Sequence, residues 1–297
     1  MTSLELDASE LGDLEARVER ALTRGDRSEL SVLGYGEVST VLGYDRGEER
    51  LAVKRLPLFW RASEWERYHA AFHDYLALLP RRGVRPLPSK LAVVERDDGA
   101  LAVWCVQPRL EAHCLLSKHL HDVSEARAVE VFERVLSAIA TAVGPEVGLD
   151  GQLSNWVLVG DELAYLDVTT PLLRDDRHAE RLPIGVFLAS LPWALRPVVR
   201  RFMLQGILDK YYEPRGVVLD LLGNLHKEKL ERWLPRFLEI ANARVSPRLS
   251  QDEVRRYYDS DARSWALLQR LRHMDRWWQT RVRRKVYPFL LPGSIER

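Results

Sequence analysis

The sequence predicts an α+β fold in two parts, a β-rich part followed by a mainly helical part. Short apolar runs separated by turn signals fill residues 29–108, which is typical of antiparallel strands. From residue 112 onward, apolar residues recur every three or four positions, which is typical of helices. We therefore predict two domains: residues 1–111, a small β-rich domain opened by a helix, and residues 112–297, a mainly helical domain.

The β-rich part is expected to hold a five-stranded antiparallel sheet and two helices. In order, the predicted elements are a helix over 9–23, three strands within 29–56, a helix over 62–79, and a hairpin of 91–95 with 101–106. Ser9 is the expected N-cap of the first helix, because its hydroxyl can accept a hydrogen bond from the first turn. Pro80 is expected to end the second helix, and residues 107–112 leave the sheet as a hinge.

The helical part begins with a long helix predicted over residues 124–143, which leads directly into a polar loop. Two apolar stretches follow, 156–159 and 163–166, and the turn between them predicts a hairpin. The rest of the chain is predicted to be helical, with breaks at Pro192, Pro197, Pro214 and Pro247.

Length and composition allow one large or two modest domains with a substantial core. The chain has 297 residues, of which 46% are hydrophobic, and nine are tryptophan. Its charge is balanced, with 44 basic and 43 acidic residues, so no nucleic-acid partner is expected.

Cysteine usage and hydropathy favour a cytoplasmic protein. Cys105 and Cys114 do not form a Cys-x-x-Cys pair, which argues for a reducing compartment and against a structural zinc site. The first 19 residues lack an apolar signal core, and residues 183–199 are too interrupted by proline and arginine to span a membrane.

The polar loop and hairpin carry the strongest functional signal. Asp150 precedes Asn155 by five residues, and Asp167 follows after a further twelve. The hairpin is expected to hold Asn155 and Asp167 close together at its open end. Two oxygen ligands in this arrangement suit Mg²⁺, which binds few protein groups together with phosphate oxygens. Asp150 would lie one loop away and take a proton from an attacking hydroxyl.

A second signal lies in the β-rich part. Gly34 and Gly36 would allow a strand–turn–strand backbone to approach the phosphates of a ligand. Lys54 interrupts an apolar strand, where a buried ammonium group needs a negative partner such as phosphate.

The order and spacing of these residues resemble the protein-kinase-like fold, in particular its aminoglycoside and choline phosphotransferases. The resemblance covers about residues 28–170 and implies an ATP- and Mg²⁺-dependent small-molecule kinase. It implies that Lys54 grips the phosphates, Asp150 is the base, and Asn155 and Asp167 hold the metal. Adenine would then lie against Val53 and the backbone of residues 107–110.

The chain departs from the family pattern at four points. Ser39 replaces the third glycine of the loop, Gly148 stands where the family has histidine, and Thr169 replaces the glycine after the metal-binding aspartate. The helix carboxylate that pairs with the lysine in the family is expected to be Glu66, with Glu64 and Asp74 as the other candidates.

Each residue also has a simpler interpretation that stays open. The glycines fit an ordinary hairpin, Lys54 fits an edge strand, and Asp150, Asn155 and Asp167 fit local turns. Transfer to the hydroxyl of a small molecule is the favoured function, and a kinase-like module that binds nucleotide or a partner protein without turnover is the alternative. Transfer of a nucleotidyl group would use the same residues.

The C-terminal segment mixes basic and aromatic residues at helical spacing. Residues 272–291 are expected to form a last helix with its tryptophans packed on the core and its arginines facing outward. Contact of this helix with a membrane surface is the alternative.

Overall fold

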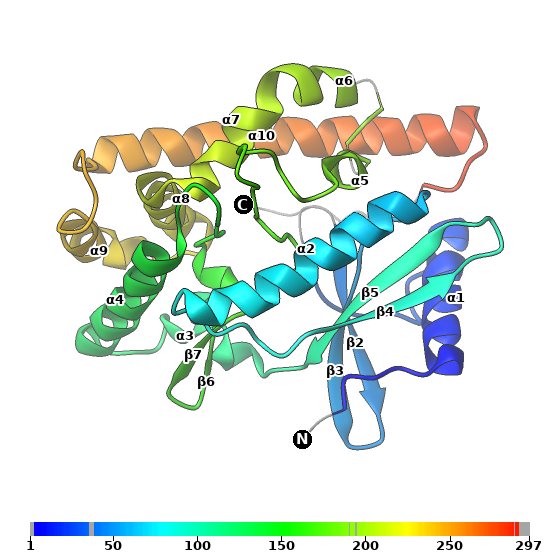
Figure 1. Ribbon diagram of the computed structural model, residues 1–297, viewed down its shortest axis with the longest axis horizontal. Helices are drawn as coiled ribbons and strands as arrows, with labels where there is room; N and C mark the ends of the chain where they lie inside the picture. The colour runs from blue at the N-terminus through cyan, green and yellow to red at the C-terminus, as the bar shows by residue number, and fades with distance from the viewer. Residues whose placement is uncertain (1–2, 36–38, 190, 194, 288, 291–297) are drawn as a thin grey trace.

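A five-stranded sheet and a group of helices make up the two parts of the fold (Figure 1). The computed structural model of the chain describes residues 3–35, 39–189, 191–193, 195–287 and 289–290. The α+β prediction is confirmed, with the antiparallel sheet in the N-terminal part and helices in the C-terminal part.

The sheet is antiparallel throughout and has the strand order β1-β2-β3-β5-β4. Its strands are β1 Ser31–Tyr35, β2 Thr40–Arg46, β3 Glu49–Arg55, β4 Lys90–Glu95 and β5 Leu101–Pro108. Lys54 of β3 lies opposite Cys105 of β5, and Val53 lies opposite Val106. Because side chains alternate along a strand, Lys54 and Val53 point to opposite faces of the sheet.

Helix α1, Ala8–Arg24, covers the face of the sheet to which Val53 points. Its leucines and Val18 form one apolar cluster with Val53 and Trp104. Glu15 is buried at this contact, where it pairs with Arg55 at 2.5 Å and with Arg96 at 2.7 Å. The helix begins with Asp7 as its N-cap, in a capping box with Glu10, and the prediction of Ser9 in this role was wrong.

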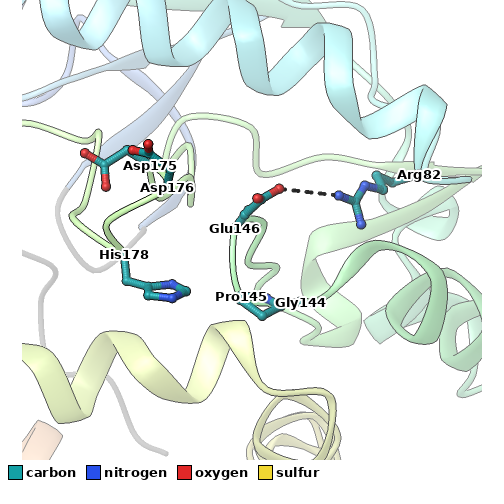
Figure 2. A pocket seen from close by; sticks show the side chains of 7 residues that line it. All are labelled: Arg82, Gly144, Pro145, Glu146, Asp175, Asp176 and His178. Carbon is teal, nitrogen blue, oxygen red and sulfur yellow. Dashed lines mark ion pairs between the residues drawn. The ribbon is translucent and has the colours of Figure 1, made fainter.

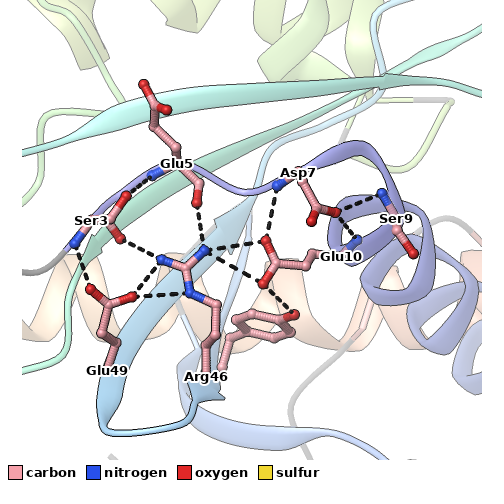
Figure 3. A network of polar contacts seen from close by, with 8 residues as sticks. Ser3, Glu5, Asp7, Ser9, Glu10, Arg46 and Glu49 are labelled. Atoms are coloured by element: carbon pink, nitrogen blue, oxygen red, sulfur yellow. Dashed lines mark hydrogen bonds and ion pairs between the residues drawn. The ribbon is translucent and has the colours of Figure 1, made fainter.

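The segment before α1 is fastened to the β2–β3 hairpin by Arg46 (Figure 3). Its guanidinium donates to the carbonyl oxygens of Ser3 and Glu5, and it also pairs with Glu10 and Glu49. The partly exposed side chain of Arg46 thus connects the N-terminal segment, α1 and the hairpin.

Helix α2, Ala62–Arg81, crosses the other face of the sheet (Figure 1). Aromatic side chains recur every three or four residues along it, and Tyr68, Phe72 and Tyr75 are fully buried. Each such side chain contributes roughly 1.5–3 kcal/mol of burial free energy. From the sequence, Pro80 is expected to end this helix, but Pro80 lies inside its last turn, and the helix continues to Arg81.

Helices dominate the chain after residue 112. They are α3 Leu116–His119, α4 Glu125–Ala142, α5 Ile184–Leu188, α6 Arg196–Val198, α7 Leu204–Asp209, α8 Pro214–Lys227, α9 Leu234–Ala241 and α10 Gln251–Trp277, with shorter turns between them. Ser124 caps α4 by accepting a hydrogen bond from the backbone of Arg127. The core between α4 and α9 includes Phe132 and Phe237, whose rings stack with centroids 3.9 Å apart.

A two-stranded ribbon, β6 Trp156–Val159 and β7 Glu162–Tyr165, confirms the predicted hairpin. Gly160 takes a φ of +62° in its turn, a conformation that favours glycine. The ribbon is also bound to the linker between α2 and β4, because Tyr165 donates to Arg85 at 2.7 Å and accepts from Leu87 at 2.8 Å through backbone atoms. These backbone hydrogen bonds therefore connect the ribbon to the segment that leads into β4 of the sheet.

The C-terminal helix differs from its prediction. Trp277 and Trp278 are exposed, whereas the sequence pattern had been interpreted as placing these tryptophans on the core. Within the described ranges, no helix combines the length and apolar character needed to cross a membrane.

Candidate functional site

The β6–β7 ribbon brings Asn155 next to the segment that carries Asp167. The backbone N–H of Leu166 donates to the carbonyl oxygen of Asn155 at 2.7 Å, one residue before Asp167. The side-chain Nδ2 of Asn155 donates to the carbonyl oxygen of Asp150 at 3.3 Å. Asn155 is therefore hydrogen-bonded both to the residue before Asp167, through its backbone, and to Asp150, through its side chain.

Lys54 reaches Asp167 across the two parts of the fold. Its Nζ lies 2.9 Å from Oδ1 of Asp167 and 2.6 Å from the hydroxyl of Thr169. Thr169 in turn donates to the same Oδ1 at 2.8 Å. An ammonium, a carboxylate and a hydroxyl therefore form a closed triangle between β3 and the loop after β7.

This triangle keeps Asp167 ionised. Burial alone would raise the pKa of Asp167, but the charge of Lys54 and the hydrogen bonds from Lys54 and Thr169 outweigh it and hold the pKa below its usual value. A carboxylate that is ionised at neutral pH is what a divalent cation requires.

Helix α2 contacts this loop through a tyrosine. The hydroxyl of Tyr68 donates to the carbonyl oxygen of Thr169 at 3.0 Å. Glu66, the expected partner of Lys54, is an exposed residue of α2, and Asp74 pairs with Arg181. Among the described residues, the ion pair of Lys54 is with Asp167, so the structure does not bring Glu66 to the lysine.

The sheet geometry changes one expectation about the nucleotide. Val53 is buried against α1, so the adenine contact expected of it is wrong, and Ala52 shares the face of Lys54. The side chain of Gln107 is already used, since it donates to Ser89 and to the carbonyl oxygen of Leu166, both at 2.9 Å.

Gly34 lies in β1 at an irregularity of register with β2, where glycine is common. Gly36, the second glycine expected to cover the phosphates, lies outside the described residues.

Asp150 has an environment opposite in sign to that of Asp167. Loss of hydration, followed by the negative charges of Asp220 and Asp167, raises its pKa from 3.8 to about 8. The backbone N–H of Gln152, which donates to its Oδ1 at 3.2 Å, and the charge of Lys210 act in the other direction. A carboxylate with a pKa near neutral pH is suited to accept a proton.

Gly148, which stands where the resembling family has histidine, is explained by close packing. A Cβ at this position would lie 3.0 Å from Leu172 Cβ, 3.1 Å from the carbonyl oxygen of Tyr211 and 3.2 Å from the ring of Tyr212. The adjacent Leu149 N–H donates to that same Tyr211 oxygen at 3.0 Å. The segment at residues 210–212 thus supports the Asp150 loop at close range.

That segment carries Lys210, the start of a second charged network. Its Nζ lies 2.9 Å from Oδ1 of Asp220 on α8 and 2.9 Å from the hydroxyl of Tyr257 on α10. Tyr257 also donates to Asp220. Burial opposes the charge of Lys210, but Tyr211, Asp220 and Tyr257 outweigh it, and the pKa of Lys210 is raised.

Two buried carboxylates near the loop keep unsatisfied oxygens. In the part of the chain that the structure describes, Oδ2 of Asp220 and Oε2 of Glu228 have no hydrogen-bond partner. The other oxygen of Glu228 accepts from the backbone N–H of Ser154 at 3.1 Å, and burial raises the pKa of Glu228 to about 7. Acidic groups are therefore concentrated around Asp150.

A pocket of about 150 Å³ is lined by other residues (Figure 2). It is lined by Arg82, Gly144, Pro145, Glu146, Asp175, Asp176 and His178. Arg82 and Glu146 form an ion pair of 3.8 Å across it. Ligand pockets for drug-sized molecules start at roughly 300 Å³, so this one does not suit a nucleotide.

No cluster of three or more His, Cys, Asp or Glu side chains suited to a metal occurs among the described residues. A site made of Asp167 and Asn155 has only two protein ligands and needs the oxygens of a bound phosphate to complete it.

Sequence reasoning missed the residues that reach the site from a distance. Tyr68 belongs to no functional motif of the sequence, and the same holds for Lys210, Asp220 and Tyr257. The stretch between Lys210 and Asp220 contains charged residues, a proline and a glycine, so no sequence pattern marks the two as a buried pair.

The chain belongs to the family described as "Family of unknown function (DUF6206)", which it matches over residues 13–276. None of the curated proteins compared with it matches. Among solved structures, it is similar to "WaaP in complex with acyl carrier protein" at 18% sequence identity and a TM-score of 0.33, covering 75% of this chain and 96% of that one. Both values are low, so function has to be inferred from the site itself.

Proposed function

We propose that this protein is a Mg²⁺-dependent phosphotransferase that moves the γ-phosphoryl group of ATP to a hydroxyl of a small molecule. The observation that supports it most is the contact of Lys54 with Asp167 at 2.9 Å, which joins the sheet to the loop that follows the ribbon. Asn155 is held one hydrogen bond away from that loop, and Asp150 is held by Asn155. These are the four positions that such a reaction needs.

The residues present fit a metal that bridges phosphates. Asp167 is ionised, and Asn155 uses its nitrogen as a donor, so its oxygen is the atom suited to a hard cation. When bound, Mg²⁺ would neutralise the charge of the phosphate oxygens. Lys54 would exchange its contact with Thr169 for a phosphate oxygen, and Gly34 would let the backbone of β1 approach.

Asp150 would act on the acceptor. The acceptor oxygen forms a bond to the γ-phosphorus, the bond from that phosphorus to the bridging oxygen of ADP breaks, and the acceptor proton passes to Asp150. A pKa of about 8 makes Asp150 a better proton acceptor than an ordinary carboxylate. Its orientation is fixed by Gln152 and by the close support of Tyr211 under the loop.

A second candidate, a nucleotide-binding module without turnover, is favoured by the Lys54 triangle. Lys54 is satisfied by Asp167 and Thr169. Helix α2 contacts this site through Tyr68, whose hydroxyl donates to the carbonyl oxygen of Thr169. In this candidate the same residues bind the nucleotide and no phosphoryl group is transferred.

The test combines binding and turnover. Melting temperatures are measured with ATP and Mg²⁺, with ATP and EDTA, and without nucleotide, because a ligand of the folded state raises the melting temperature. Transfer is then followed by ADP release, with a panel of sugars, amino sugars and amino alcohols as acceptors. The proposal expects a metal-dependent shift and ADP release that requires an acceptor.

Two variants make the result specific. Asp150→Asn is expected to keep the shift and to lower ADP release by about 10²–10⁴-fold. Glu66→Gln is the matched control, expected to change neither measurement by more than about twofold. A metal-dependent shift with no transfer to any acceptor would favour the binding module, and the absence of any shift would exclude both candidates.

A further inference from the structure

The outer face of α10 and the turn after it carry one continuous line of apolar and basic side chains. We call Leu267, Arg270, Met274, Trp277, Trp278 and Arg281 the basic–aromatic stripe. These positions follow one another at steps of three or four residues, with Trp277 and Trp278 adjacent, so they lie on one side of the helix. Figure 1 shows α10 running along the length of the helical part.

The stripe is exposed, and the opposite side of α10 is not. Leu267 is 58% exposed, Met274 64%, Trp277 60% and Trp278 44%. Val254, Arg272 and Asp275 are buried on the side that contacts the protein. The helix therefore packs on the core through its other face, and the stripe is an additional apolar surface that packing among the described residues does not explain.

The charge of this segment is strongly one-sided. Residues 267–286 contain seven basic residues and one acidic residue, and that acidic residue, Asp275, is buried. Arg283, Arg284 and Lys285 are exposed directly after the stripe. Because the whole chain has a net charge of only +1, the rest of the molecule carries a net negative charge.

We propose that the basic–aromatic stripe is a docking surface for an anionic lipid bilayer. Tryptophan and leucine side chains would enter the boundary between headgroups and acyl chains, and the arginines would keep their guanidinium groups at the anionic headgroups. The stripe lies parallel to the helix axis, so the helix would lie in the plane of the interface without crossing it.

The charge of this surface argues against its being an interface between two copies of the chain. Two stripes brought face to face would place like charges opposite one another with no acidic partner, which is unfavourable. An anionic lipid surface supplies the missing negative charge over the whole length of the stripe. This inference does not depend on the proposed phosphotransfer.

The test is co-sedimentation of the purified protein with vesicles. Vesicles of phosphatidylcholine with about 30% phosphatidylglycerol are compared with vesicles of phosphatidylcholine alone, at low and at high salt. The protein is expected to bind the anionic vesicles, to bind them more weakly as salt rises, and to leave the neutral vesicles largely in solution.

Paired variants separate the apolar and the charged contributions. Trp277→Ser with Trp278→Ser should weaken binding by about tenfold or more. Arg281→Gln, Arg283→Gln and Arg284→Gln together should weaken it by roughly a hundredfold. The controls are Trp60→Ser and the combination of Arg24→Gln, Arg61→Gln and Arg67→Gln, which change exposed residues elsewhere and should leave binding unchanged.

The outcomes are decisive as long as each variant keeps the melting temperature of the parent. Equal binding to both kinds of vesicle, or loss of binding in the controls as much as in the stripe variants, would overturn the proposal. A dimer that disappears in the tryptophan variant would assign the stripe to a second copy, and tight binding of single-stranded RNA in place of vesicles would assign it to nucleic acid.

Discussion

Asp150 lies in the loop before the β6–β7 ribbon and Asp167 in the loop after it, and the structure gives the two carboxylates opposite environments. Asp167 meets a lysine and a hydroxyl, and its pKa is lowered. Asp150 loses hydration beside other carboxylates, and its pKa is raised to about 8. The comparison shows how the two ends of one ribbon can give the same type of residue a raised pKa at one end and a lowered pKa at the other.

The largest effect is expected from the Asp167 end of the site. Asp167→Ala removes the ionised ligand and leaves Lys54 with Thr169 alone. Phosphoryl transfer should fall by about 10³-fold or more, and the Mg²⁺ dependence of ATP binding should disappear. Calorimetric titration of ATP with and without Mg²⁺ measures the second effect, and a variant that still binds ATP in a metal-dependent way would break the comparison.

The Asp150 end can be shifted in both directions through its neighbours. Lys210→Met removes a charge that lowers the pKa of Asp150, so the rise of kcat/KM with pH should move to higher pH. Asp220→Asn removes a charge that raises this pKa, so the rise should move to lower pH.

In the proposed reaction Asp150 must be deprotonated to act, so activity is expected to fall below its pKa in every case. Each shift is expected to be about one pH unit, measured from full pH profiles. Equal shifts of the same sign in the two variants would show that the network supports the fold only and does not set the charge of Asp150.

Stability provides a test of the Asp150 environment without any substrate. The folded protein holds the proton of Asp150 to a higher pH than the unfolded chain does, so this residue lowers stability progressively as pH rises from 3.8 toward about 8. Asp150→Asn cannot ionise and should raise the melting temperature at pH 8.5 by about 2–5 °C, with little difference near pH 4. An equal rise at both pH values would point to packing as its cause.

The smallest effect is expected at Thr169. Thr169→Val keeps the shape of the buried side chain and removes the hydroxyl that bridges Lys54 and Asp167. Transfer should change by about fivefold or less, since one hydrogen bond of roughly 1 kcal/mol is lost. Activity reduced as strongly as in Asp167→Ala would mean that the hydroxyl itself takes part in binding.

Local features of this site could be predicted from the sequence, because they depend on neighbouring residues. The hairpin from Trp156 to Tyr165 follows from two apolar stretches and a glycine turn, and it positions Asn155 beside the Asp167 segment. Side chains alternate along a strand, so the sequence alone places Val53 and Lys54 on opposite faces of the sheet. An adenine contact of Val53 on the face of Lys54 could therefore have been excluded from the sequence.

Long-range features could not be predicted in this way. Lys210, Asp220 and Tyr257 come from the turn before α8, from α8 and from α10, and only tertiary packing brings them together. The outward position of Trp277 has the same origin, since helical periodicity identifies a face of α10 but does not say which face meets the protein.

The two thiols of the chain differ enough to make one of them a selective attachment point. Cys105 is buried beside Lys54, and burial raises its pKa to about 12, so it resists alkylation. Cys114 is half-buried in the turn Ala112–Cys114, where the chain leaves the sheet for the helices. A maleimide dye would therefore attach at this crossing point without prior mutagenesis, and a change in its emission would report a change in the environment of this turn.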